Sequence, residues 1–200
     1  MTTSSTVRLT ATLLLAATVV LGTGTASSTP TPSAPTTTTA SPTSTIKWTA
    51  ESLTTAFAAI NQKLGSNPEW TRLDIANDGT GMDVEAVDPA NRDSIIKYIY
   101  TAATGQVELQ TIAYIPSEKR EQRGIATFTS SDVSLDTLLT IGPKALRDTA
   151  IQDGYVWDYV IGKSANPPSF LIEVNVYGPD RVHNEKLADY DMVGNLISVS

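Results

Sequence analysis

The chain has 200 residues, of which 40% are hydrophobic and 18% are charged, and its formal net charge at pH 7 is −7. This acidic balance argues against nucleic acid and anionic membrane surfaces as partners, because both are bound through patches of Lys and Arg. The chain contains no cysteine, which excludes disulfides, cysteine nucleophiles, thiolate metal sites and a thioether-linked lipid anchor.

Residues 1–26 have the composition of a secretory signal peptide. Arg8 is followed by an apolar run from Leu9 to Leu21, and small residues then lead to Ala26. This order is typical of an exported protein, and the run is shorter than the ~20 apolar residues of a membrane-spanning helix. We therefore expect cleavage after Ala26, with an uncleaved anchor as the alternative. Cleavage would remove Arg8 and change the net charge to −8.

Residues 27–46 are almost entirely Ser, Thr, Pro and Ala. They carry too little apolar surface to offset the entropy of an ordered chain, so we expect a disordered linker. A plain linker and an O-glycosylated stalk both fit this composition. The sequence therefore predicts a secreted or cell-envelope protein with one folded region, which begins at Lys47. Contact with a membrane is expected only if the signal segment is retained as an anchor.

The folded region begins with a predicted helix. Thr49 can cap it, and an Asn-Pro pair at Asn67 follows its end. Its apolar residues recur on one helical face at Leu53, Phe57, Ile60 and Leu64. After Glu69 the apolar period changes to two, which predicts strands, and Asn-Asp-Gly predicts a hairpin turn. The strands predicted here span residues 70–76, 82–87, 94–100 and 106–114.

The second half of the folded region follows a connector, residues 117–133, which opens with a charged stretch. A second helical segment starts at Ser134, is interrupted by Gly142 and Pro143, and continues to Asp153. Alternating apolar residues then predict further strands. These strands span residues 155–161, 170–177, 186–191 and 196–199.

The two halves share the order helix, strand, strand, strand, turn, strand, and their last turns correspond at Gly105 and Gly194. Self-similarity of this kind signals repeated units. We therefore predict an α+β fold built from two degenerate helix-plus-antiparallel-strand repeats, residues 47–116 and 134–200. Their helices would cover one face of a continuous or paired antiparallel sheet. Chance similarity of two αβ stretches is the alternative.

The closing turn of each half resembles the D-x-x-T-G-x-[VL] hairpin of the PepSY domain. Residues 101–107, Thr-Ala-Ala-Thr-Gly-Gln-Val, match it with Thr in place of Asp. Residues 191–196, Asp-Met-Val-Gly-Asn-Leu, match it more loosely, without the Thr and one residue shorter. Two such units in tandem are similar in outline to the secreted β-lactamase-inhibitory proteins of actinobacteria. This resemblance implies a binding or inhibitory role without a target, although those inhibitors carry disulfides and this chain has none.

No convincing catalytic set is present in the sequence. His183 is the only histidine and lies in a polar turn region, and no G-x-S-x-G nucleophile elbow exists. Carboxylate pairs such as Asp88/Asp93 and Asp189/Asp191 lie at strand ends or in turns, where Asp is common for conformational reasons. Acid–base catalysis would require burial to separate their pKa values. We expect no catalytic residues, no cofactor and no enzymatic activity.

One acidic stretch resembles a calcium loop. Asp74, Asp78 and Glu85 would fall at positions 1, 5 and 12, and Gly79 at position 6. Ala76, however, occupies position 3, where an oxygen ligand is required. A hairpin turn explains the Asn-Asp-Gly without an ion, so no metal site is expected.

The aromatic residues are better candidates for a binding surface. Tyr98 and Tyr100 are two residues apart on one predicted strand, and Tyr155, Trp157 and Tyr159 follow the same spacing on another. Strict alternation would place each set on one face of the sheet. Aromatic rings on an exposed face bind proteins well because they bury large areas with few rotatable bonds. Packing of the same rings against the helices, as core, is the alternative.

The sequence therefore predicts an exported, non-enzymatic module that binds or inhibits another extracytoplasmic protein, whose identity it does not give. A cell-envelope protein that carries a small hydrophobic ligand, or that acts as a surface spacer, is the alternative. An internal cavity lined by Val, Ile and Leu would favour that second function. An enzyme that uses acidic residues is the third hypothesis and would require a cleft with two facing carboxylates.

Overall fold

The computed structural model describes residues 47–163, 169–180 and 184–200. The predicted signal peptide (1–26), the predicted linker (27–46) and His183 lie outside these residues. Within the described residues, no helix is both long and apolar enough to cross a membrane.

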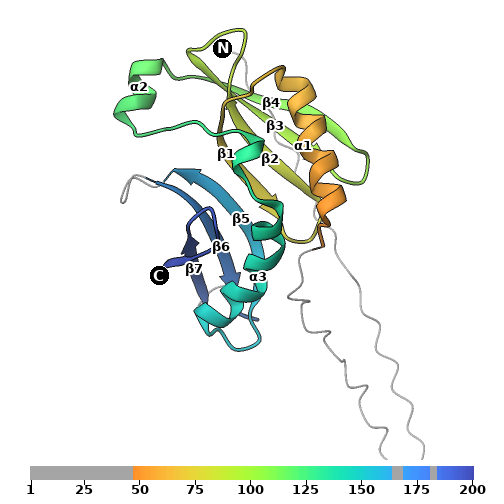
Figure 1. Cartoon of the computed structure of the whole chain (residues 1–200), viewed down its shortest axis with the longest axis vertical. Helices are drawn as coiled ribbons and strands as arrows, with labels where there is room; N and C mark the ends of the chain where they lie inside the picture. Colours follow the sequence, from red (N-terminus) through yellow and green to blue (C-terminus); the bar gives the residue numbers. More distant parts are fainter. Residues whose placement is uncertain (1–46, 164–168, 181–183) are drawn as a thin grey trace, which may run out of the picture. The chain divides into compact units, whose positions relative to one another are not determined.

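Eight strands pair in one antiparallel sheet, in the order β4-β3-β2-β1-β5-β6-β7-β8 (Figure 1). Every strand predicted from the alternating apolar pattern is confirmed to within two residues at each end. The strands are β1 (Trp70–Ala76), β2 (Gly81–Val87), β3 (Ser94–Thr101), β4 (Gln106–Tyr114), β5 (Tyr155–Lys163), β6 (Phe170–Tyr177), β7 (Glu185–Tyr190) and β8 (Leu196–Val199).

The first predicted helix is confirmed as α1 (Ala50–Leu64). The Thr49 side chain accepts a hydrogen bond from the Ser52 backbone N–H, and the Ser52 hydroxyl oxygen accepts one from the Thr49 N–H, so the two residues form a reciprocal cap. The predicted apolar face is the buried face of the helix, and Leu53 and Ile60 are fully buried. The α1 helix is therefore defined at its start by a local cap and along its length by burial.

The second helix, α3 (Leu135–Thr149), differs from the prediction in two ways. It continues through Gly142 and Pro143 without interruption, and it ends at Thr149, where Ala150 adopts the left-handed conformation. The predicted interruption is wrong because a buried face continues from Leu138 to Thr149 and packs on the sheet. Tertiary packing outweighs the unfavourable local propensity of the Gly-Pro pair.

The connector also contains helices that the sequence did not indicate. The charged stretch forms α2 (Ser117–Gln122), and Ser130–Asp132 forms a short 3₁₀ helix, η1. The Arg120 guanidinium is buried and donates hydrogen bonds to the backbone carbonyls of Arg92 and Ile115. The connector is therefore fixed to the turn before β3 rather than extended into solvent.

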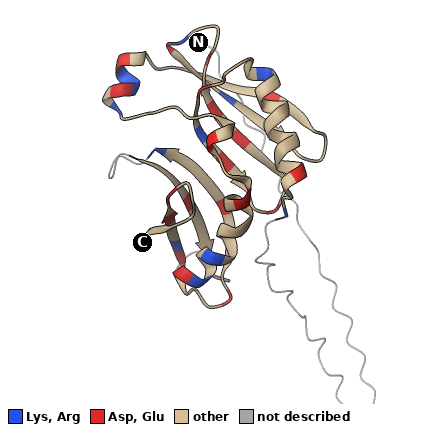
Figure 2. Ribbon diagram, viewed as in Figure 1, with Lys and Arg blue, Asp and Glu red and all other residues tan. Residues whose placement is uncertain are grey.

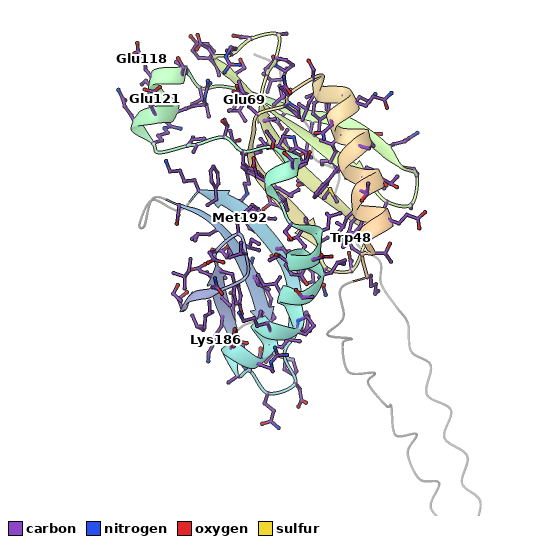
Figure 3. All side chains as sticks on the ribbon, in the orientation of Figure 1. Trp48, Glu69, Glu118, Glu121, Lys186 and Met192 are labelled. Carbon is purple, nitrogen blue, oxygen red and sulfur yellow. The ribbon has the colours of Figure 1, made fainter. Side chains whose placement is uncertain are left out.

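Both long helices pack on the same face of the sheet, α1 against β3 and β4 and α3 against β5, β6 and β7 (Figure 1). Trp48 lies at the start of α1 and donates a hydrogen bond from its Nε1 to the Ala76 carbonyl oxygen, 2.8 Å away (Figure 3). Lys186 of β7 lies near the end of α3, where its Nζ donates to the Thr149 carbonyl oxygen at 2.7 Å (Figure 3). These bonds connect both helices to the sheet.

The predicted division into two helix-plus-strand repeats is wrong. Strand accounts for 40% of the described residues and helix for 27%, and all eight strands belong to one antiparallel sheet. Strand β1 pairs with β5 from Arg72↔Gly162 to Ala76↔Asp158, which joins the two halves. A chain of ring contacts also crosses them: Phe57 with Trp70, Trp70 with Phe128, and Phe128 with Phe170. Because the halves share backbone hydrogen bonds and one core, they are not separate units.

Candidate functional site: the open face of the sheet

The sheet has one face covered by α1 and α3 and a second face, here called the open face, on which polar side chains predominate. Alternation along each strand separates the two sets. On β1, Leu73 and Ile75 are buried beneath the helices, whereas the side chains of Arg72 and Asp74 retain 48% and 26% of their exposure. The open face is the candidate site because its side chains are not needed to fill the core.

The register of the strands aligns acidic side chains in a row across the open face. Asp83 of β2 is paired with Asp74 of β1, and Glu173 of β6 is paired with Asp189 of β7. Val160 of β5 connects the two pairs, since it is the partner of both Asp74 and Glu173. Glu108 of β4 lies at one end of the row, opposite Ile99. These five residues, Glu108, Asp83, Asp74, Glu173 and Asp189, are here called the acidic row. Figure 2 shows acidic residues on several strands of the sheet.

Like charges directly opposite each other in a sheet repel and destabilise it. The repulsion is reduced by ion pairs at Asp74 and Asp83, but by a raised carboxyl pKa at Glu173. Arg72 Nε lies 2.8 Å from Asp74 Oδ2, and Lys97 Nζ lies 2.7 Å from Asp83 Oδ2. Hydrogen bonding to these carboxylates raises the pKa of both basic groups. For Glu173, burial is the main cause of a raised carboxyl pKa, and the charge of Asp189 raises it further.

A groove of roughly 830 Å³ is hollowed into the open face, where β1 and β2 meet the ends of β3 and β5. Asp158 of β5 lines this groove, and burial raises the pKa of its carboxyl group, which accepts a hydrogen bond from Asn175 Nδ2. Its lining includes four carboxylates and one basic residue, Lys47, together with apolar side chains such as Ile99 and Trp157; the carboxylates are those of Asp74, Asp78, Asp83 and Asp158. The groove therefore combines negative charge with an aromatic wall.

A β-bulge places Trp157 in this wall. The pairing of β5 with β6 goes from Val156↔Val176 directly to Asp158↔Asn175, so Trp157 is the extra residue. Its side chain is 45% exposed. The Trp157 and Tyr155 rings both lie beside the ring of Tyr177, at centroid distances of 6.2 and 6.3 Å. These three rings form an aromatic group next to the acidic groove.

The bulge also explains why Tyr155, Trp157 and Tyr159, which were predicted to share one face of the sheet, lie on different faces. Tyr159 is fully buried beneath α3, where its hydroxyl donates to Asn77 Oδ1 at 3.2 Å and burial raises its pKa. Tyr155 and Trp157 lie on the open face instead. Strict alternation would have put all three on one face, but the extra residue at Trp157 reverses the alternation within β5.

Tyr98 and Tyr100 do share a face of β3, but it is the face beneath the helices. Tyr100 is only 5% exposed, and its ring centroid lies 6.3 Å from that of Trp48. Tyr98 is partly buried and packs against the same core. For Tyr98, Tyr100 and Tyr159 the structure therefore matches the alternative interpretation, in which the rings are core.

The acidic residues considered as catalytic or calcium-binding candidates take part in turns and ion pairs. Asp78 Oδ1 accepts hydrogen bonds from the Thr80 N–H and hydroxyl, which lowers the Asp78 pKa. Asp191 accepts from the backbone of the hairpin turn before β8, and Asp88 from the Ala90 N–H. Within the described ranges, no three His, Cys, Asp or Glu side chains are grouped so that they could hold a metal ion.

Sequence reasoning missed the acidic row and Tyr177. Each acidic residue of the row lies at a polar position of an alternating strand, which indicates only exposure to solvent. Their alignment depends on the register between strands that are distant in sequence, β1 with β5 above all. Tyr177 stands at the last position of a predicted strand, so its position opposite Tyr155 depends on the β5–β6 pairing.

No family model matches the chain, and neither does any curated protein. A solved structure that is similar to it is that of a putative lipoprotein from Clostridium difficile 630. The match has a TM-score of 0.52 and 18% sequence identity, and it covers 72% of this chain and 89% of that protein. At this identity the likeness concerns the fold alone. The comparisons give no support to the resemblance to PepSY domains or to β-lactamase-inhibitory proteins.

Proposed function

We propose that the chain is an exported, non-enzymatic binding module that engages a basic surface of another extracytoplasmic protein through its open face. The observation that carries the proposal is the groove of roughly 830 Å³ in that face, with Trp157 45% exposed in its wall. Tryptophan is one of the residue types enriched among those that dominate the energy of protein–protein contacts. The groove would receive a side chain or loop of the partner.

The charge of the open face supports a basic partner. The facing pair Glu173–Asp189 brings like charges together, which the fold itself does not require. Residues that oppose stability at a surface are often kept for function. A partner with Lys and Arg at the contact would gain from this potential, which also speeds association at low salt.

The extracytoplasmic part of the proposal rests on two observations. Residues 1–26 have the signal-peptide pattern, and the similar solved structure is described as that of a putative lipoprotein. The non-enzymatic part is supported by the ion pairs of Asp74 and Asp83, the two carboxylates that face each other in the groove. An inhibitory role is supported only by the sequence resemblance to β-lactamase-inhibitory proteins.

The first test is retention of exported proteins on the chain from residue 27 onward, followed by measurement of the dissociation constant for the purified retained partner. Trp157→Ala should weaken binding at least ~10-fold, as truncation of a central aromatic residue does. Val193→Ala is the matched control, because Val193 is 76% exposed in the turn before β8. Equal losses in both variants would contradict the placement of the contact.

Charge is tested with two double variants of equal net charge. Glu173→Gln/Asp189→Asn neutralises two of the five carboxylates of the acidic row, whereas Glu118→Gln/Glu121→Gln neutralises two residues of α2 (Figure 3). Only the first should slow association and reduce its salt dependence. If the purified chain instead retains lipid and no protein, the proposal fails and the hydrophobic-ligand function takes its place.

A further inference from the structure

The two edges of the sheet carry nearly all of the exposed apolar side chains. Among the described residues, seven of the eight exposed large hydrophobic residues lie on β4, on β8 or in the turn before β8, and Trp157 is the eighth. On β4 they are Leu109, Ile112 and Tyr114, which are 50%, 59% and 71% exposed. Exposed apolar residues along a sheet edge indicate a surface to which another strand can add.

Strand β4 lacks most of the features that keep edge strands from pairing. It has nine residues, of which only Glu108 is charged, and none is Pro or Gly. Among the residues that the structure describes, β4 is a terminal strand with a strand partner on one side only, so the N–H and C=O groups of its outer edge are not used in the sheet. Its one irregularity is a bulge opposite Lys97 and Tyr98. The other edge strand, β8, has only four residues.

Pairing with β3 shows which side of the sheet each β4 side chain occupies. Residues that face each other across two paired strands point to the same side of the sheet. The side of each β4 residue therefore follows from the side of its partner on β3. The pairs on the helix side are Val107 with Tyr100, Leu109 with Tyr98, Ile112 with Ile96 and Tyr114 with Ser94. The side chains on the open side are Glu108, Thr111 and Ala113, opposite Ile99, Lys97 and Ile95. Gln110, between the two registers, is the bulged residue.

We propose that β4 pairs antiparallel with β4 of a second copy of this chain, about a twofold axis between Gln110 and Thr111. In this register Leu109 faces Ile112 of the second copy, and Val107 faces Tyr114. On the open side Glu108 faces Ala113, so the single charge never meets itself. The polar residues Gln110 and Thr111 meet at the axis. In this register apolar side chains meet apolar side chains, polar ones meet at the axis, and like charges are kept apart.

The bulge makes this register specific. On both sides of Gln110, every facing pair joins side chains that lie on the same side of the sheet, whereas a shift by one residue would oppose Leu109 and Thr111. Pairing through a twofold axis closes the assembly. Pairing of β4 with β8 would repeat without closing and could use only the four residues of β8.

The same axis would set the arrangement of the two grooves. A twofold axis between antiparallel strands is perpendicular to the sheet, so the open faces of both copies lie on the same side. The dimer would then present two grooves to one surface, which increases the strength of binding to a multivalent target. The dimer itself does not depend on the function proposed above.

The first test is sedimentation equilibrium of the chain from residue 27 onward over a wide range of concentrations. We expect a dimer whose dissociation constant rises at least ~100-fold in Ile112→Lys, because the twofold axis introduces the charge twice. Ile197→Lys in β8 is the matched control, since Ile197 is also exposed, at 45%. If Ile112→Lys does not fold, Tyr114→Lys replaces it, because Tyr114 is the most exposed of the three.

The second test is cross-linking, for which the absence of native cysteine is an advantage. Under mild oxidation, a mixture of Leu109→Cys and Ile112→Cys chains should form a disulfide-linked heterodimer, because facing residues lie within disulfide range. Leu109→Cys mixed with Ile197→Cys should form none above background. A wild-type chain that is monomeric at every concentration would overturn the proposal. So would a dimer that Ile197→Lys dissociates and Ile112→Lys does not.

Discussion

On the open face, burial disfavours the charged form of two carboxyl groups, those of Asp158 and Glu173, and raises the pKa of each. The charge of Asp189 acts on Glu173 in the same direction. In the unfolded chain these groups are fully hydrated and ionise at their ordinary pKa. Their ionisation is therefore less favourable in the folded state, and it lowers the free energy of unfolding. The same residues contribute to the negative surface on which the proposed function depends, so stability and binding should respond oppositely to their removal.

This opposition gives a prediction for Glu173→Gln. The pKa of Glu173 in the folded state is raised above its ordinary value of 4.5. Below pH 4.5 the group is protonated in both states, and its carboxyl does not reduce the stability of the wild type. As the pH rises from 4.5 through the raised pKa, ionisation progressively destabilises the folded state. The variant should therefore equal wild type at pH 3.5 and exceed it at pH 7, by less than about 1 kcal/mol because solvent screens the group.

Urea unfolding at the two pH values measures this difference. Glu121→Gln, which changes one exposed carboxylate of α2, is the control and should give the same difference from wild type at both pH values. A Glu173→Gln variant that is less stable than wild type at pH 7 would contradict the raised pKa and indicate a stabilising role for the charged carboxylate.

At the scale of elements, the approach of α3 to the sheet is set by one glycine. A Cβ at Gly142 would meet the hydroxyl of Tyr159, which is itself held by its hydrogen bond to Asn77. Asn77 Nδ2 in turn donates to the Val156 carbonyl oxygen, so the hydroxyl cannot move away without breaking a buried network. The helix can lie this close to β5 only because position 142 has no side chain.

Gly142→Ala and Tyr159→Phe should therefore be coupled. In the wild-type background, Gly142→Ala should destabilise the protein. The overpacking costs about 1–3 kcal/mol, which exceeds the gain of about 1 kcal/mol from the higher helix propensity of Ala relative to Gly. In the Tyr159→Phe background the hydroxyl is gone and the next atoms lie at ordinary contact distance, so Gly142→Ala should stabilise the protein by up to about 1 kcal/mol. Urea unfolding of wild type, the two single variants and the double variant should give a coupling free energy of at least about 1 kcal/mol.

Gly162→Ala provides the control for this cycle. A Cβ at Gly162 would make an ordinary contact of 3.8 Å with the Thr71 carbonyl oxygen, and its effect should not depend on residue 159. Additive free energies for Gly142→Ala and Tyr159→Phe would show that α3 moves to accommodate the added carbon, which would contradict the rigid approach.

These elements also mark the limit of what the sequence could predict. The cap at Thr49 and the apolar alternation that predicts strands are local signals, and the cap and the positions of the strands were confirmed. The bulge at Trp157 is not encoded by a recognisable local pattern, and it reversed the expected face of Tyr159. The acidic row required the β1–β5 register, which joins residues far apart in the chain. Local physics thus predicted the elements, and pairing between strands determined the site.

At the scale of the whole molecule, the β1–β5 pairing and the aromatic contacts make the two halves depend on each other. Trp70 of β1 contacts Phe57 of α1 on one side and Phe128 of the connector on the other, and Phe128 contacts Phe170 of β6. The backbones of Trp70 and Phe128 also exchange two hydrogen bonds of 2.8 Å. Separation of the halves would expose this cluster and one edge of each central strand.

We therefore predict that the chain unfolds in a single cooperative transition and that a fragment of residues 47–133 does not fold alone. In urea, far-UV circular dichroism and tryptophan fluorescence should give coincident transitions, because Trp48, Trp70 and Trp157 report from both halves. The fragment keeps α1 and β1–β4 but loses the partner strand of β1 and the ring of Phe170. Dispersed amide NMR signals from that fragment, or two separated transitions in the whole chain, would show that the halves are independent after all.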